Sequence, residues 1–333
     1  PLSGARMALV VGDVPGHGLR AAATMGRLRT TLRALAALDL PPDELLSRLD
    51  DLVAQARIGI HPAPGDQLVQ DAANGATCLY AIYDPTTRNC TMASAGHLPP
   101  VRITPEGTAA PLKLPIGPPL GTGGLPYEYA EFDLDPGSTL ALFTDGLLTA
   151  EYDDLDTGLA ELDRTLTQQQ AAPADLCQRV ADRFLRRPGH DDATLLVVRV
   201  HGLPDNQMAS WPIPADPAEV AAARALTTRR LAQWGLDDVG FAAELVISEL
   251  VTNAIRYGGP PVNLRLLWDR QRMLICEVSD GGHTSPHLRR ADLDDEGGRG
   301  LFLVAQLTNR WGTRPSRHGK TIWAEIPLEE QPL

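Results

Sequence analysis

The sequence lacks any apolar run of the ~18–20 residues that cross a bilayer, and no charged-then-apolar leader opens it. Hydrophobic residues make up 43% of its 333 residues, and the mean hydropathy is −0.14. These values are typical of soluble globular material, so we expect no membrane segment. The length is sufficient for two domains with separate cores.

Basic charge is also scarce, because 30 Lys and Arg residues face 42 Asp and Glu residues, which gives a net charge of −12. The only lysines are Lys113 and Lys320. A nucleic-acid surface requires a basic footprint, so the composition argues against a nucleic-acid partner. The preference for arginine over lysine is typical of a GC-rich bacterial genome.

The few cysteines form no Cys-x-x-Cys pair. They are Cys78, Cys90, Cys177 and Cys276, and three of them lie within apolar runs. We interpret them as reduced core thiols, which favours a cytoplasmic location.

Three aspartates lie at the ends of apolar, strand-like runs. Asp13 ends the run Leu9–Gly12 before a glycine-rich turn, and Asp145 follows Ser138–Thr144. Asp191 stands just before the run 195–200. Three carboxylates gathered at one sheet edge need a cation to offset their repulsion. A two-metal site that activates water for attack on a phosphate is the function that this pattern favours.

Four motifs carry a resemblance to a known family. They are Gly-Asp-Val-Pro-Gly-His-Gly (12–18), Ala-Gly-His-Leu-Pro-Pro (95–100), Thr-Asp-Gly (144–146) and Asp-Asp-Ala-Thr (191–194). In this order they resemble the SpoIIE/RsbU branch of the metal-dependent type 2C (PPM) serine/threonine phosphatases. The resemblance covers about residues 1–200 and implies a four-layer αββα sandwich.

The same resemblance implies the roles of individual residues. Asp13 would bridge two Mn²⁺ or Mg²⁺ ions, and the Val14 carbonyl would bind one of them. Asp145 and Asp191 would hold the other metal, with Asp192 behind them. The family usually carries a Gly-Gly-Asp-x-x-Asp strand upstream of the first residue here. We therefore expect a fragment of a longer protein that binds one metal well and the second poorly.

Two histidines of these motifs have alternative interpretations. His17 either protonates a leaving group or is a turn residue. His97 either contacts phosphate or holds its loop by hydrogen bonds, and the second role is the commoner one.

The pattern of the chain predicts helices over 19–38, 41–56, 158–169 and 174–187, and a hairpin over 76–94. We expect a phosphatase domain over 1–201, a linker over 202–210 and a second domain over 211–330. The second domain opens with predicted helices over 217–234 and 239–257.

The second domain carries another ordered set of motifs. Glu249 and Asn253 are one helical turn apart, and Asp280 ends a strand before Gly281-Gly282. Gly298 and Gly300 precede a helix over 301–307, where backbone N–H groups suit phosphate oxygens. With 319–323, this set resembles the GHKL ATP-binding fold of RsbW-like anti-sigma serine kinases, a two-layer α/β sandwich.

By this resemblance Asn253 would coordinate Mg²⁺ and Asp280 would accept from the adenine amino group of ATP. Glu249 would be the base that prepares a serine for phosphorylation. Gly282, Gly298 and Gly300 would shape the nucleotide pocket and its lid, and Thr321 would lie near adenine. A histidine kinase has the same ATP fold, but the helix over 217–234 contains no phosphoacceptor histidine.

The combined resemblance implies a phosphatase for a phosphorylated, STAS-type anti-sigma factor antagonist, with a kinase-like domain that either phosphorylates this antagonist or holds a sigma factor. One chain would then write and erase the same phosphoserine. Two alternatives stay open: a non-catalytic clamp for a sigma factor, and a nucleotide sensor that gates the phosphatase. Both families often pair, so a homodimer is expected.

Overall fold

The computed structural model describes residues 1–58, 75–152, 154–167, 171–186, 192–269, 273–283, 300–316 and 319–328. The chain divides into two compact units. The first consists of Pro1 and Arg6–Gly202, and the second of Leu2–Ala5 and Leu203–Leu333. No helix within the described ranges combines the length and apolar character that a bilayer crossing requires.

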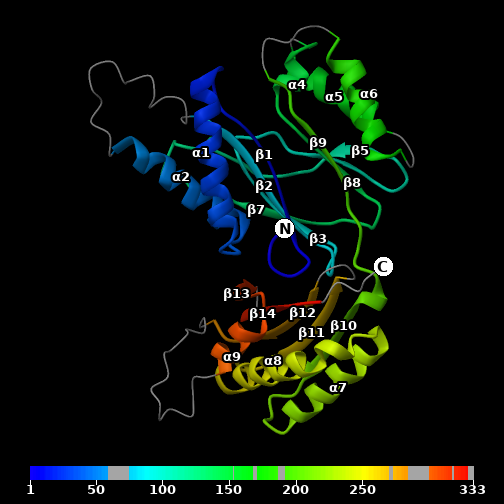
Figure 1. Cartoon of the computed structure of the whole chain (residues 1–333). Helices are drawn as coiled ribbons and strands as arrows, with labels where there is room; N and C mark the ends of the chain where they lie inside the picture. The colour runs from blue at the N-terminus through cyan, green and yellow to red at the C-terminus, as the bar shows by residue number, and fades with distance from the viewer. Residues whose placement is uncertain are drawn as a thin grey trace. The chain divides into compact units, whose positions relative to one another are not determined.

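Two sheets form the centre of the first unit (Figure 1). The first sheet contains β1 (Met7–Asp13), β2 (Thr77–Asp84), β3 (Asn89–Ala95), β6 (Ile116–Gly117) and β7 (Tyr129–Asp133), in the order β1-β2-β3-β6 with β7 also paired to β3. The second sheet has the order β5-β4-β8-β9 and consists of β4 (Val101–Ile103), β5 (Ala109–Pro111), β8 (Thr139–Phe143) and β9 (Leu195–Arg199).

The strand β8 shows why the layers stack as they do. Its Leu140 and Leu142 are buried against Leu9 and Val11 of the first sheet. Its alternate residues, including Phe143, join a separate apolar cluster with the helices on the other side. Because side chains alternate along a strand, a continuous apolar run predicts burial on both faces.

Helices cover the outer face of each sheet in the first unit. They are α1 (Leu19–Ala36), α2 (Pro42–Ile58), α4 (Gly146–Thr149), α5 (Leu155–Leu166) and α6 (Pro173–Phe184). Helix α2 packs on β2 and β3, and α1 packs on α2, while α6 packs on β9 (Figure 1). The predicted four-layer αββα sandwich is therefore confirmed.

The hairpin of β2 and β3 has the turn that its sequence predicts. The side chain of Asp84 accepts hydrogen bonds from the N–H of Thr86 (2.8 Å) and from its hydroxyl. This Asx turn reverses the chain, and the strands then pair antiparallel from Asp84–Asn89 to Cys78–Ala95.

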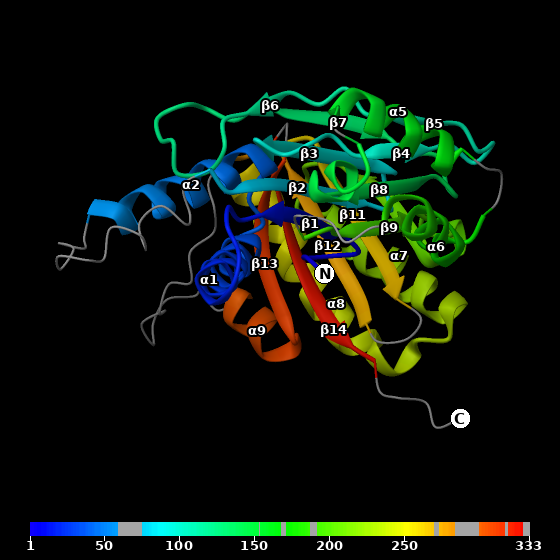
Figure 2. The same cartoon turned by 90° about the horizontal axis from the view of Figure 1, so that it is seen from above.

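The second unit is a five-stranded antiparallel sheet with helices on one face (Figure 2). Its order is β10-β11-β12-β14-β13, from β10 (Met208–Ile213), β11 (Val262–Asp269), β12 (Met273–Asp280), β13 (Arg310–Ser316) and β14 (Gly319–Pro327). The helices are α7 (Glu219–Trp234), α8 (Gly240–Asn253) and α9 (Gly300–Leu307), with short turns η1 (Asp205–Gln207), η2 (Asp237–Val239) and the π-helical η3 (Ala254–Gly258). This is the predicted two-layer α/β arrangement.

The predicted linker over 202–210 extends too far at its C-terminal end, because residues 208–210 already belong to the strand β10. Ala209 and Ile213 are buried in the core of the second unit, and Trp211 packs against it. Pro212 is tolerated because β10 is the edge strand of this sheet, where one side needs no ladder hydrogen bonds.

The four cysteines are free thiols, as predicted. Cys78, Cys90 and Cys276 are buried, and burial raises the pKa of each to about 12. Such thiols are unreactive core residues.

Candidate metal and nucleotide sites

Asp13 is the last residue of β1, and it pairs in register with Thr77 of β2. The preceding Gly12 lies so close to β2 that a Cβ there would be 2.5 Å from the Thr77 carbonyl oxygen. Val14 is buried, whereas residues 15–18 are exposed and lead into α1. The strand end therefore presents the half-buried Asp13 next to an open glycine-rich turn.

Asp145 follows β8 and caps the short helix α4. Its side chain accepts a hydrogen bond from the Gly146 N–H (3.0 Å), and the residue is exposed. The neighbouring Thr144 binds the chain that leads into β9. Its N–H donates to the Thr194 carbonyl (3.1 Å), and its hydroxyl accepts from the Thr194 N–H (2.9 Å).

These hydrogen bonds place the segment after β8 beside the segment that carries Asp192. Asp192 is exposed. Asp191, the third predicted metal ligand, lies outside the described residues.

His97 connects the strand ends that carry Asp13 and Asp145. Its Nδ1 lies 2.8 Å from the Thr77 hydroxyl and its Nε2 lies 3.0 Å from the Phe143 carbonyl oxygen. Thr77 is the register partner of Asp13, and Phe143 precedes Asp145 by two residues.

Burial lowers the pKa of His97, although the Phe143 hydrogen bond and the Asp145 charge act in the opposite direction. A buried, neutral imidazole with both nitrogens occupied is a positioning group. The structure thus agrees with the loop-holding interpretation of this histidine. His17, in contrast, is exposed in the glycine-rich turn.

Within the described part of the chain, no three His, Cys, Asp or Glu side chains form a metal-binding group. The predicted set of three carboxylates therefore stays a prediction. The donors that are described, Asp13 and Asp145, are carboxylates, and they offer the oxygen ligands that Mg²⁺ and Mn²⁺ prefer.

The second unit brings Glu249 of α8 to the start of α9. A Cβ on Gly300 would collide with the Glu249 carboxylate. Asn253, one turn further along α8, is half-buried like Glu249. Glu249 thus lies next to the glycine that opens α9, and Asn253 follows it one helical turn along α8. Gly298 lies outside the described residues.

Asp280 ends β12 and is only 3% exposed. Its Oδ1 accepts from the Gly282 N–H (2.8 Å) and pairs with Lys320 Nζ (2.8 Å). Its Oδ2 has no hydrogen-bond partner among the described residues. An orphaned, buried carboxylate oxygen fits a ligand that donates a hydrogen bond, as the amino group of adenine does.

Backbone without side chains surrounds this carboxylate. A Cβ on Gly258 would overlap the Asp280 carboxyl group, and one on Gly319 would overlap the Asp280 carbonyl. Gly319 also has a φ of 147°, which L-residues avoid. Both positions therefore require glycine for Asp280 to sit where it does.

Lys320 is a residue that the sequence reasoning missed. In the register of β12 and β14, Lys320 is opposite Asp280, whereas Thr321 is opposite Ser279. Because side chains alternate along a strand, Thr321 points to the other face of the sheet. The Asp280 carboxylate thus contacts Lys320. Thr321 lines the same cavity as Asp280, and its place near adenine stays a prediction. The one signal in the sequence that could have pointed to Lys320 is the rarity of lysine, because the chain contains only two lysines.

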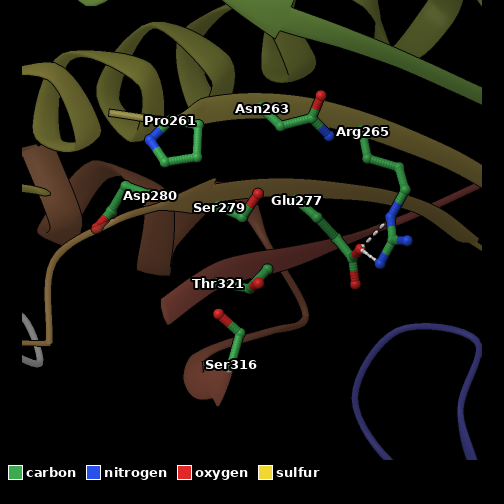
Figure 3. A pocket seen from close by; sticks show the side chains of 8 residues that line it. All are labelled: Pro261, Asn263, Arg265, Glu277, Ser279, Asp280, Ser316 and Thr321. Carbon is green, nitrogen blue, oxygen red and sulfur yellow. Dashed lines mark hydrogen bonds and ion pairs between the residues drawn. The ribbon is translucent and has the colours of Figure 1, made fainter. Parts of the chain in front are cut away.

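A polar cavity of about 320 Å³ lies on the helix-free face of the same sheet (Figure 3). Its lining residues are Pro261, Asn263, Arg265, Glu277, Ser279, Asp280, Ser316 and Thr321. Figure 3 shows the Asp280 carboxylate pointing away from the Arg265–Glu277 pair. Asp280 thus belongs both to the lining of this cavity and to the pair with Lys320.

The layers of the first unit, with aspartates at the ends of β1 and β8, define the αββα class of metal-dependent phosphatases. The family model "Stage II sporulation protein E (SpoIIE)" matches residues 3–201, and the model "Histidine kinase-like ATPase domain" matches residues 213–326. The chain belongs to the SpoIIE family, with an ATPase domain of the histidine kinase-like type behind it.

Individual relatives agree with this assignment. Phosphoserine phosphatase RsbU of Bacillus subtilis is 25% identical over 197 residues, which cover 57% of this chain and 55% of that protein. Protein IcfG of Synechocystis sp. is 26% identical over 207 residues, which cover 57% of this chain and 32% of that protein. The matches thus span about half or less of these relatives.

A solved structure is similar over both units. The RsbU and RsbW domains of Rv1364c from Mycobacterium tuberculosis are 26% identical, with a TM-score of 0.53. The match covers 97% of this chain and 85% of that chain. The predicted fusion of an RsbU-like and an RsbW-like domain is therefore confirmed.

Proposed function

We propose that the first unit is a metal-dependent protein serine/threonine phosphatase. The observation that carries this proposal is the His97 bridge, which holds the strand ends of Asp13 and Asp145 together. Bound Mn²⁺ or Mg²⁺ would supply an activated water and offset the phosphate charge. Asp13, the Val14 carbonyl, Asp145 and Asp191 would hold the ions, and the buried His97 would keep their strands in register.

The substrate that we propose is a phosphorylated, STAS-type anti-sigma factor antagonist. The similarity to RsbU and to the RsbU–RsbW pair of Rv1364c supports a place in such a regulatory system. The second unit would bind ATP with Mg²⁺ through Asn253 and Asp280. Glu249 would act as the base that takes the proton of the antagonist's serine hydroxyl while the γ-phosphoryl group passes to the serine oxygen and ADP leaves. Alternatively, the unit would hold a sigma factor.

The phosphatase half is tested with p-nitrophenyl phosphate and Mn²⁺ on the full chain. Asp145→Asn should lower the rate by at least about 100-fold, because removing a metal ligand costs more than the 10–100-fold typical of outer-shell partners. Asp156→Asn removes an exposed carboxylate from the first turn of α5 and should leave the rate unchanged. Equal rates for the two variants would contradict the proposal.

The kinase half is tested with γ-labelled ATP and a purified STAS-domain antagonist. The unmodified chain should transfer label to a serine, and Glu249→Gln should remove transfer while ATP binding persists. If the unmodified chain binds ATP, transfers no label and changes its phosphatase rate with ATP, the nucleotide-sensor alternative is correct.

A further inference from the structure

The pair of Asp280 and Lys320 is one of the most enclosed ion pairs of the second unit. The Lys320 side chain is 8% exposed and that of Asp280 is 0% exposed. Charged side chains rarely lose their water unless they are paired, so the pair requires an explanation in structure or in function.

Asp280 and Lys320 do not use all of their hydrogen-bonding groups on each other. Asp280 Oδ1 accepts from Lys320 and from the Gly282 N–H, which leaves Oδ2 as an acceptor without a partner among the described residues. The ammonium of a lysine has three hydrogens, and the bond to Asp280 uses one of them. The pair therefore presents one acceptor and, beside it, a donor.

This order of groups matches one edge of adenine. The 6-amino group of adenine donates, and the adjacent N1 accepts. Guanine has the opposite order on the same edge, because O6 accepts and N1 carries a hydrogen. In the same position, guanine would place its O6 acceptor against the Asp280 carboxylate, which is also an acceptor. Its N1–H donor would face the Lys320 ammonium, which is also a donor. The pair can therefore discriminate strongly between adenine and guanine.

We propose that Lys320 is a specificity-determining residue that donates to N1 of adenine while Asp280 Oδ2 accepts from the 6-amino group. The inference rests on the proposed ATP binding of the second unit and assigns a further residue to that site. Gly258 and Gly319 fix Asp280 in this position, because a Cβ at either residue would overlap it.

The first test changes the ligand and leaves the protein unmodified. Titration calorimetry compares MgATP with 1-deaza-ATP, which lacks only the N1 acceptor, and with 7-deaza-ATP as the matched control. We expect 1-deaza-ATP to bind about 10-fold more weakly than ATP, the cost of a buried donor left unpaired, and 7-deaza-ATP to bind like ATP. Equal affinity for ATP and 1-deaza-ATP would overturn the role of Lys320.

The second test is Lys320→Met, with Lys113→Met as the matched control at the other, exposed lysine. Lys320→Met should bind ATP and 1-deaza-ATP equally, whereas Lys113→Met should keep the preference for ATP. A Lys320→Met chain that keeps the preference would refute the inference. If this variant does not fold, the ligand comparison on the unmodified chain decides alone.

The binding of ATP and the role of Lys320 are tested separately by these measurements. If the unmodified chain does not bind ATP, the proposed nucleotide-binding function fails, and the role of Lys320 falls with it. If ATP binds and 1-deaza-ATP binds as well, only the role of Lys320 fails.

Discussion

At the scale of single residues, Glu277 shows how a charge is kept inside the second unit. It is 2% exposed on β12, and its Oε2 accepts from Arg265 Nε (2.7 Å) while its Oε1 lies 2.7 Å from Arg314 Nη1. Burial alone would raise the pKa of Glu277, but the charges and hydrogen bonds of Arg314 and Arg265 lower it to about 2. Two arginines, one from the adjacent β11 and one from β13 beyond β14, thus outweigh the loss of water around one carboxylate.

Glu277→Gln should lower the free energy of unfolding of the second unit by about 3 kcal/mol, since it removes the buried negative charge that the Arg265 and Arg314 guanidinium groups contact. All five tryptophans lie in this unit, at 211, 234, 268, 311 and 323. Tryptophan fluorescence during urea unfolding therefore reports on it selectively. Asp238→Asn is the control in the same unit, because Asp238 is exposed in η2 and its change should alter stability by a few tenths of a kcal/mol at most.

The same pair of proteins tests the pH dependence. The pKa of Glu277 is lower in the folded chain than the ordinary value of 4.5. Its contribution to stability is thus complete above about pH 4.5 and is lost as the pH falls from there toward 2. Unfolding measured by tryptophan fluorescence should show this loss in the unmodified chain and less of it in Glu277→Gln. Identical pH profiles would contradict the assignment.

The residue scale also shows where sequence reasoning ends. Asp13, Asp145 and Asp280 were predicted because each follows an apolar run and precedes a turn, which are local signals. The partners of these residues are not local. Lys320 lies 40 positions from Asp280, and only the strand register brings them together.

At the scale of elements, the strongest local patterns led to correct predictions. The helices over 19–36 and 42–58 follow from runs of helix-forming residues, and the hairpin of β2 and β3 from Asp84 at its turn. The edge strand β10 was missed, because a strand with a proline and only alternate buried residues carries a weak signal.

The pairing of β1 with β2 is an element whose function can be tested through one glycine. A Cβ on Gly12 would be 2.5 Å from the Thr77 carbonyl oxygen, so Gly12→Ala must push the two strands apart directly before Asp13. We expect p-nitrophenyl phosphate turnover to fall by roughly 100-fold, since a displacement of about 1 Å is enough for such a loss.

Gly26→Ala is the matched control for this change. Gly26 is exposed within α1 and a Cβ there meets nothing within 4 Å. This variant should keep its turnover and gain up to about 1 kcal/mol of stability, because alanine is the better helix former. Loss of turnover in both variants would show that the effect does not come from the β1–β2 contact.

At the scale of the whole molecule, each unit has a core of its own. One apolar cluster joins α7, α8 and α9 to the sheet of the second unit, and two other clusters fill the layers of the first. Among the described residues, these clusters share no member. Units with separate cores are expected to unfold as separate cooperative transitions.

Ligands should then stabilise one unit at a time. With MgATP at about 100 times its Kd, the second unit gains about 2.7 kcal/mol, which raises its Tm by on the order of 10 °C. Heating followed by tryptophan fluorescence should show this shift, because the first unit contains no tryptophan. Circular dichroism sees both units, so in a buffer that contains Mg²⁺ throughout it should show a second transition that the addition of ATP leaves in place. Asp280→Asn should abolish the shift, since it weakens the acceptor proposed for adenine. A single transition that MgATP moves equally for both probes would mean that the two units unfold as one cooperative body.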